Sequence, residues 1–381
     1  MADDTMLRKS ERHALNVLVL DEAFVSGTMT AIGLARAGCT VRVLAAAGGV
    51  GRSNGRNPQW ELGPRPNDHR LLPLLDEIVR RQAIDVIYPV TEPLQQVLWD
   101  TTPTWSDRVF PAWHEWQRAL LVDKQCMSAH MARAGLQVPD ERPASNDGDV
   151  ETGVSELGLP VVVKGSSGRG GAATIIAESV DAARIAARRI RSRGMNAFLQ
   201  SYVDGPTFLA GGLFDRGEAL RLYAGEKTVQ FPSRTGPAAE LRSTGDASFV
   251  AAARAAFKAA GVSGIASVDF IRDERGEFQF LELNPRPWGS MAAVRGAGSD
   301  LFSPLVGMWS GKVITPCLDY EIGKRTPVFP LYLLSGRYWR SGRALLTALN
   351  SDAVSVLRLA RQNPSLALHL AHRLMRVGLN W

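Results

Sequence analysis

The segment GIASVDFIRDERGEFQFLELNPRPWGS (264–290) constrains the fold of this chain more than any other. It reads as strand, turn and strand, with the turn at 273–276. In an antiparallel pair closed by that turn, Asp269 lies opposite Phe280. The two-residue period of side chains predicts that the face of Asp269 also carries Glu282 and Asn284. The other face, expected to point to a core, carries Val268, Phe270, Leu281 and Leu283.

This hairpin predicts a site for metal-bound phosphate. Two carboxylates and an amide share one face, and Arg286 follows immediately. Hard cations such as Mg²⁺ prefer oxygen ligands of this kind. The alternative is a solvated hairpin face with scattered polar residues, against which the run LELNPRPWGS is unusually specific.

A second motif, KGSSGRGG (164–171), combines a lysine with a glycine-rich turn. Lys164 ends an apolar strand, where its ammonium can meet a phosphate as a point charge. The glycines let the turn close its backbone N–H groups over phosphate oxygens. Taken alone, the segment also suits an ordinary hairpin loop.

The first hundred residues alternate strand and helix. Strands are expected at 16–21, 40–46 and 85–90, with helices between them, which predicts a small parallel α/β unit. Ligand contacts are expected where the strands end, at Asp21, Glu22, Ser26, Thr91 and Glu92;. A helix with an Asp123 cap follows, then a loop over 140–150 and a mixture of strands and helices. The fold class expected is therefore α/β followed by α+β.

Composition narrows the class of protein. The 381 residues are 45% hydrophobic and 22% charged, which is ordinary for a soluble globular chain;. The net charge of +6 resides in the last 51 residues, with seven arginines and one acid, so we expect no nucleic-acid partner;. Three scattered cysteines and a polar start without a signal core favour a cytoplasmic location;. No uncharged apolar run approaches the ~18 residues that span a bilayer.

Together these segments resemble the ATP-grasp superfamily. The order of motifs matches over about 14–315: DK (123–124), VVVKGSSGRGG (161–171), LQSYVDG (199–205), SVDFI (267–271) and ELNPR (282–286). The resemblance implies a pre-ATP-grasp domain at 14–121 and an ATP-grasp domain at 122–315. The latter divides into a lid lobe (about 140–203) and a large lobe (about 204–315). Residues 1–13 are expected to be disordered, and 316–381 to form a basic helical extension.

The resemblance also implies roles for individual residues. Lys124 and Lys164 would bind ATP phosphates under a lid containing Gly168, Gly170 and Gly171. The hinge against adenine would be Gln200, Ser201, Tyr202 and Val203. Two Mg²⁺ ions, or Mn²⁺, would be held by Asp269, Glu282 and Asn284. Arg286 and Arg242 would stabilise transferred charge, although a solvated loop is an alternative for Arg242 and Arg234.

The sequence departs from the superfamily at three positions. Ser201 and Asp269 stand where glutamate is more common, and Pro206-Thr207 replaces a ribose- or metal-facing glutamate. These changes affect the expected ribose contacts and the metal geometry, while the main set of motifs is intact.

The activity implied is that of a ligase. ATP would phosphorylate a small carboxylate, such as an amino acid, and an amine would attack the acyl-phosphate, with release of ADP and phosphate. One alternative is carboxylation through carboxyphosphate, as in biotin carboxylases, although the chain has no AMKM-type carrier motif. The other is a non-catalytic ATP-binding regulatory protein. A dinucleotide oxidoreductase or P-loop enzyme is disfavoured, because GxGxxG and GxxxxGK[ST] are absent;.

The tail at 331–381 reads as basic amphipathic helices split by Pro364. It suits a helical cap or the face of a homodimer, or alternatively contact with an anionic membrane surface. His369 and His372 have helical spacing but no third ligand nearby, so a metal site is not expected there.

Overall fold

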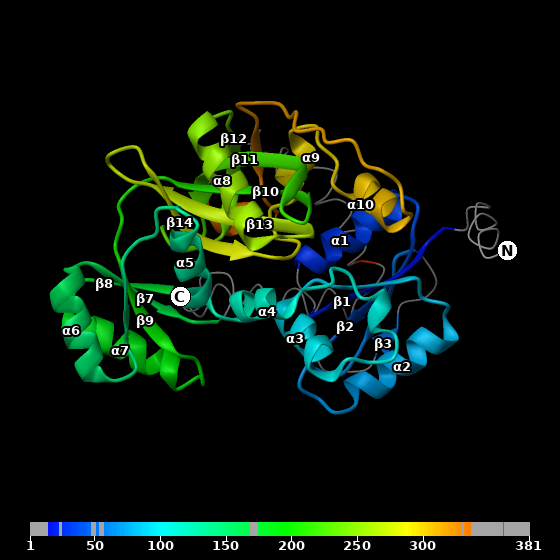
Figure 1. Cartoon of the computed structure of the whole chain (residues 1–381), viewed down its shortest axis with the longest axis horizontal. Coiled ribbons are helices and arrows are strands. Elements are labelled where there is room, and N and C mark those ends of the chain that lie inside the picture. The colour runs from blue at the N-terminus through cyan, green and yellow to red at the C-terminus, as the bar shows by residue number, and fades with distance from the viewer. Residues whose placement is uncertain are drawn as a thin grey trace.

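The computed structural model describes residues 14–22, 25–46, 51–52, 57–167, 174–329, 331–336 and 361. Within these residues the strands form three sheets (Figure 1). Their strand orders are β3-β4-β2-β1-β5, β6-β9-β7-β8 and β14-β13-β10-β11-β12-β15. The expected combination of a parallel α/β unit with α+β lobes is confirmed.

The N-terminal unit is the predicted parallel sheet. Its elements are β1 (Asn16–Asp21), α1 (Val25–Arg36), β2 (Thr40–Ala45), β3 (Gly51–Arg52), β4 (Gln59–Leu62), α2 (Leu71–Arg81), β5 (Val86–Pro89), α3 (Glu92–Thr101), a 3₁₀ turn (Ser106–Arg108) and α4 (Glu115–Val122). Strand β1 pairs in parallel with β2 and β5. Because parallel strands end at the same edge, Asp21 and the start of α3 reach the same side of the unit.

The lid lobe follows (left in Figure 1). Its elements are β6 (Glu141–Pro143), α6 (Asp147–Leu157), β7 (Val161–Gly165), β8 (Thr174–Ala177), α7 (Val180–Arg191) and β9 (Ala197–Ser201). Helix α5 (Lys124–Arg133) precedes this lobe and packs into the core of the large lobe through Met127 and Met131. The Asp123 side chain caps α5, as predicted, by accepting the N–H groups of Gln125 and Cys126. The loop expected over 140–150 is wrong. Asn146 accepts the N–H of Asp149 and starts a helix inside that range;.

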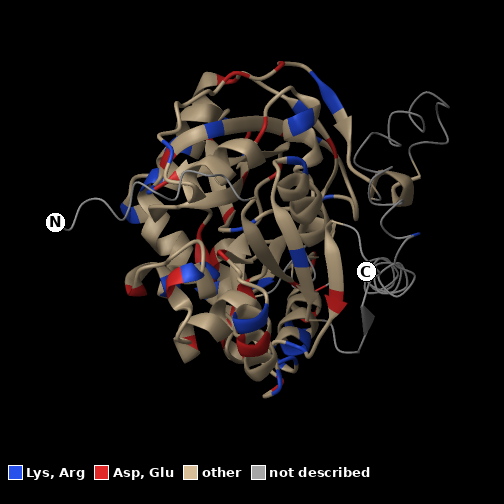
Figure 2. Cartoon of the chain, turned by 90° about the vertical axis from the view of Figure 1, so that its right-hand side faces the viewer, with Lys and Arg blue, Asp and Glu red and all other residues tan. Residues whose placement is uncertain are grey.

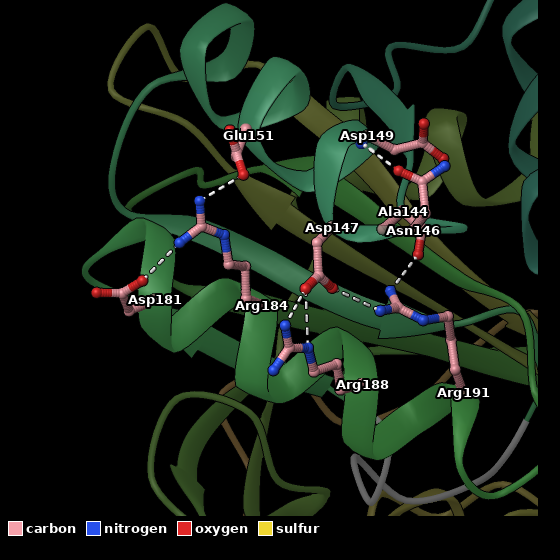
Figure 3. Close-up of polar contacts among 9 residues, drawn as sticks. All are labelled: Ala144, Asn146, Asp147, Asp149, Glu151, Asp181, Arg184, Arg188 and Arg191. Carbon is pink, nitrogen blue, oxygen red and sulfur yellow. Dashed lines mark hydrogen bonds and ion pairs between the residues drawn. The ribbon is translucent and has the colours of Figure 1, made fainter.

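Ion pairs join the two helices of the lid lobe (Figure 3). Arg184 contacts Asp181, at 2.8 Å, and Glu151. Asp147 accepts from Arg188, and from Arg191 at 2.9 Å. Acids of α6 and of the first turn of α7 therefore pair with three arginines of α7.

The large lobe holds the six-stranded sheet. Its elements are β10 (Thr207–Asp215), β11 (Glu218–Gln230), β12 (Ala238–Ser243), α8 (Ala247–Ala260), β13 (Gly264–Arg272), β14 (Phe278–Asn284), α9 (Ala292–Gly296), α10 (Phe302–Trp309), β15 (Arg325–Pro327) and α11 (Leu331–Leu334). Helix α8 covers one face of the sheet through Phe249 and Phe257. The other face shares a buried core with the N-terminal unit, in which Leu209 and Ile265 belong to the same cluster as Val17.

The β13–β14 hairpin differs from its predicted register by a β-bulge. Asp269 pairs with Glu282, not with Phe280, and Phe280 pairs with Phe270 on the core face. The extra residue is Leu281, which therefore lines a cavity instead of the core;. The bulge puts Glu282 on the same face as Asp269, because one extra residue in β14 reverses the alternation of side chains before Glu282;.

The C-terminal boundary also differs from expectation. Strand β15 pairs with β12, so residues 325–327 belong to the large sheet and not to a separate extension. The lid glycines, the start at 1–13 and the basic tail beyond residue 336, apart from Arg361, lie outside the described residues. In the view of Figure 2, ribbon segments of acidic and of basic residues are interspersed along the described chain. None of the described helices has the length and hydrophobicity to cross a membrane.

Candidate active site

A cavity of about 850 Å³ is lined by both the lid lobe and the large lobe. Strands β7 and β9 contribute from the lid lobe, and β10, β11, β13 and β14 from the large sheet. Val25 and Ser26 of α1 reach it from the N-terminal unit. The volume lies in the upper part of the range for small-molecule sites.

The predicted metal ligands meet on the wall formed by the hairpin. Asp269 and Glu282 are directly opposite each other, and Asn284 is paired with Ser267 one step along the same face. All four line the cavity. Burial raises the pKa of Asp269, although the ammonium of Lys227 favours its ionised form;.

Each of these three ligands contacts a cationic side chain. Lys227 Nζ lies 2.8 Å from Asp269 Oδ2, and Lys124 Nζ lies 3.3 Å from Glu282 Oε2. Arg286 Nη2 donates to Asn284 Oδ1 at 2.9 Å. On this wall, each oxygen ligand for a metal therefore lies next to a cationic side chain.

Lys164 faces this wall from the end of β7. Burial, with a smaller contribution from Lys124, lowers its pKa from the usual 10.5 to about 8;. The Lys124 backbone N–H donates to Ser166 O at 2.9 Å, which ties the start of α5 to the segment after β7. The structure therefore brings Lys124 and Lys164 to one place, as predicted.

The expected hinge, Gln200–Val203, lines the cavity where β9 ends. Gln200 Nε2 donates to Glu141 Oε1 at 2.8 Å, and Ser128 donates to the same oxygen. Tyr202 donates to Asp204 at 3.0 Å. Apolar side chains of both lobes face this region: Val162, Ile176, Ile271 and Leu281.

Arg286 connects this wall to the N-terminal unit. Its Nε lies 2.5 Å from Oε1 of Glu92, the first residue of α3, and its side chain is 11% exposed. Of the residues expected at the strand ends of the first unit, Ser26 lines the cavity and Glu92 contacts Arg286.

Arg242 does not line the cavity. It pairs with Glu226 on the neighbouring strand, and both lie on the sheet face opposite Asp269. The sequence suggested a loop here, but this residue lies within β12, where strand parity directs it away;. Arg234, in contrast, lines the cavity.

Two residues gain importance from the structure. Lys227 was not singled out in the sequence, yet its side chain is only 6% exposed and contacts Asp269. The alternation of β11 was the available signal, because Gly225 is level with Asp269 across β10 and Lys227 shares its face. Trp288 is buried and lines the cavity.

Comparisons with known proteins agree with this geometry. Residues 121–290 match the profile described as the ATP-grasp domain. The chain contains an ATP-grasp domain. Chloroplastic biotin carboxylase 2 of Populus trichocarpa is 30% identical over 149 residues, covering 35% of this chain and 27% of that protein. The aligned parts span about a quarter to a third of the curated relatives.

Solved structures of a biotin carboxylase and of an L-amino acid ligase share the fold of most of this chain. A biotin carboxylase from Campylobacter jejuni, described as a β-γ-ATP complex, has a TM-score of 0.66 and 15% identity. That match covers 82% of this chain and 74% of the other. An L-amino acid ligase from Bacillus licheniformis has a TM-score of 0.59 and 15% identity, covering 80% and 78%. At these identities the likeness is one of fold.

Proposed function

We propose that this protein is an ATP- and Mg²⁺-dependent ligase that joins a small carboxylate to an amine through an acyl-phosphate. The observation that carries the proposal is the convergence of cationic side chains with three oxygen ligands at one cavity. Lys164, Lys227 and Arg286 line the cavity, and Lys124 contacts Glu282, which also lines it. Such a wall suits a nucleotide triphosphate and an anionic co-substrate.

The residues present fit a magnesium site. Asp269, Glu282 and Asn284 offer hard oxygen ligands, and Asp269 Oδ1 is buried without a hydrogen-bond partner among the described residues;. No group of three His, Cys, Asp or Glu side chains gathers in the described part of the chain, so phosphate oxygens and water would complete the shell. When bound, Mg²⁺ would neutralise phosphate charge.

The side chains of the chain supply binding and charge stabilisation. Lys124 and Lys164 hold the phosphates, and Lys227 with Arg286 orients the carboxylate toward the γ-phosphorus. The carboxylate oxygen forms a bond to that phosphorus as the bond to ADP breaks. The amine nitrogen then attacks the acyl carbon, and the C–O bond breaks as phosphate leaves, which can carry the proton lost by the amine.

A second candidate is carboxylation of an acceptor through carboxyphosphate, with bicarbonate as the carboxylate. The sequence matches to biotin carboxylases favour it. Bicarbonate-dependent ADP release without any other acid would distinguish this reaction. A non-catalytic ATP-binding role would leave ATP binding without turnover. That the protein forms a homodimer, and that its tail contacts either the second subunit or an anionic membrane surface, stay predictions.

The test is ADP release by purified protein with ATP, Mg²⁺ and pooled amino acids as carboxylates and amines. We expect stimulation by the pool and loss of turnover in Glu282→Ala. Glu226→Ala is the matched control, because it removes a carboxylate from the other face of the same sheet. An active Glu282→Ala enzyme would overturn the assignment of the metal ligands.

A further inference from the structure

The cavity extends well beyond the hinge and the acids. Its lining continues across the sheet face onto β11, the β11–β12 turn and the segment after β15. Strands β14 and β12 are four positions apart in the sheet order, so the cavity spans about 19 Å at ~4.8 Å per strand;. We call the part formed by the β11–β12 turn and the segment after β15 the far end of the cavity. The hinge and the β13–β14 hairpin, where we expect the nucleotide to bind, lie elsewhere in the cavity.

The far end contains a group of apolar side chains, which we call the apolar pocket: Val229, Phe231, Pro237, Val328, Phe329 and Leu331. Polar residues of the β11–β12 turn, including Arg234, also line this end of the cavity. The cavity's acidic residues all lie elsewhere: Asp204 at the hinge, Asp269 on β13 and Glu282 on β14. Lys227 marks its boundary with the charged wall. A cationic group would find no counter-charge in this pocket, whereas an anionic group at Lys227 would place its carbon chain there.

Hydrogen bonds hold the pocket in place. Gln230 receives the hydroxyl of Thr207 at 3.1 Å and donates to Gly236 O at 2.9 Å, which fixes the turn. On the other side, the Val328 N–H donates to Ala239 O at 2.8 Å. Tyr332 is buried against Val229 and anchors α11. The apolar lining is therefore part of the folded sheet and its turn.

We propose that the carboxylate substrate carries a bulky apolar group, which enters the apolar pocket while its carboxylate lies at Lys227 and Arg286. This inference rests on the proposed function and narrows its substrate class. Bicarbonate and small polar acids would leave the pocket without an occupant that excludes water from it. An aliphatic or aryl acid would bury its carbon chain there and gain affinity with each methylene.

The test is a homologous series of acids. Calorimetry with Mg²⁺ and a non-hydrolysable ATP analogue would give the Kd of acetate, propanoate, butanoate and hexanoate. We expect the Kd to fall about three- to fourfold per added methylene. Succinate matches butanoate in chain length with a second charge, and it should bind at least tenfold more weakly than butanoate.

Two variants on one helix locate the effect. Leu331→Asp places a charge in the apolar pocket. We expect the Kd of the acids to become nearly independent of chain length in this variant. Leu334→Asp makes the same change at a residue of α11 that is 43% exposed and does not line the cavity. Leu334→Asp should keep the wild-type decrease of Kd per added methylene. An equal Kd of the non-hydrolysable ATP analogue in both variants would confirm that both are folded.

A flat series in the wild type, an unchanged slope in Leu331→Asp, or binding of no acid at all would overturn the inference. These outcomes are separate from failure of the proposed function, because the readout is binding. A steep series without ADP release from any pool would refute the ligase reaction and leave the pocket as an acid-binding site. A flat series with ADP release would leave the ligase and refute the apolar substrate.

Discussion

Lys164 should make ATP binding sensitive to pH. Its pKa of about 8, against the usual 10.5, corresponds to about 3 kcal/mol against the charged form;. The triphosphate favours the charged lysine, so above pH 8 binding must be accompanied by uptake of a proton. The Kd of ATP should therefore be level below pH 8 and rise about tenfold by pH 9 and about a hundredfold by pH 10.

Equilibrium titration of ATP from pH 7 to pH 10 measures this effect, with circular dichroism to verify the fold at each pH. Lys164→Arg is the control, because a guanidinium stays charged over the whole range. Its ATP affinity should not change with pH. Lys124→Arg separates the second lysine, since Lys164 still titrates in that variant. A wild-type Kd that is constant to pH 10, or an equal rise in Lys164→Arg, would refute the reasoning.

Other substitutions test the wall and its support. Arg286→Lys should lower kcat by about 10²–10³-fold in the ADP-release assay, because lysine lacks the planar fork that orients the substrate carboxylate; near-normal turnover would contradict this role. Gly211→Ala should lower the free energy of unfolding by about 1–3 kcal/mol in urea, because its Cβ would lie 2.5 Å from the Trp288 ring;. Gly289→Ala should leave the free energy of unfolding unchanged, because its Cβ would have no atom within 4 Å. Calorimetry should detect Mg²⁺ only with ADP present, because Lys227 competes for Asp269; equal binding without ADP would contradict the coupling.

The sequence alone predicted that Asp269 and Glu282 share one face of the hairpin. It did not predict which residues pair across the two strands. The predicted pair of Asp269 with Phe280 was wrong, yet the predicted face of Glu282 was right. Phe270 pairs with Phe280, so a regular ladder would place Leu281 opposite Asp269, and the bulge at Leu281 places Glu282 there instead;. Which residue bulges depends on packing beneath the strand. Phe280 is buried in the core with Phe270, and its N–H donates to Gln137 O outside the sheet. Leu281 thereby turns to the cavity, which no periodicity could indicate.

The second half of the site depends on longer-range pairing. Lys227 and Arg242 are both basic residues near the middle of the chain, and the sequence singled out the second. Their faces follow from the alignment of β11 and β12, which has shifts between Lys227 and Gln230. A shift of one residue exchanges the two faces of a strand. Only the assembled sheet assigns Lys227 to the cavity and Arg242 to Glu226.

The charge arrangement suggests how the three units act together. Lys164 comes from the lid lobe, Asp269 and Glu282 from the large lobe, and Glu92 from the N-terminal unit. Each of these three acids has a cationic partner in the described structure, so the carboxylates are paired before any ligand binds. A nucleotide carrying its metal exchanges partners on both sides: the phosphates take the lysines, and the metal takes the carboxylates. This exchange leaves few buried charges unpaired at any stage, which matters because an unpaired charge in such a site costs several kcal/mol.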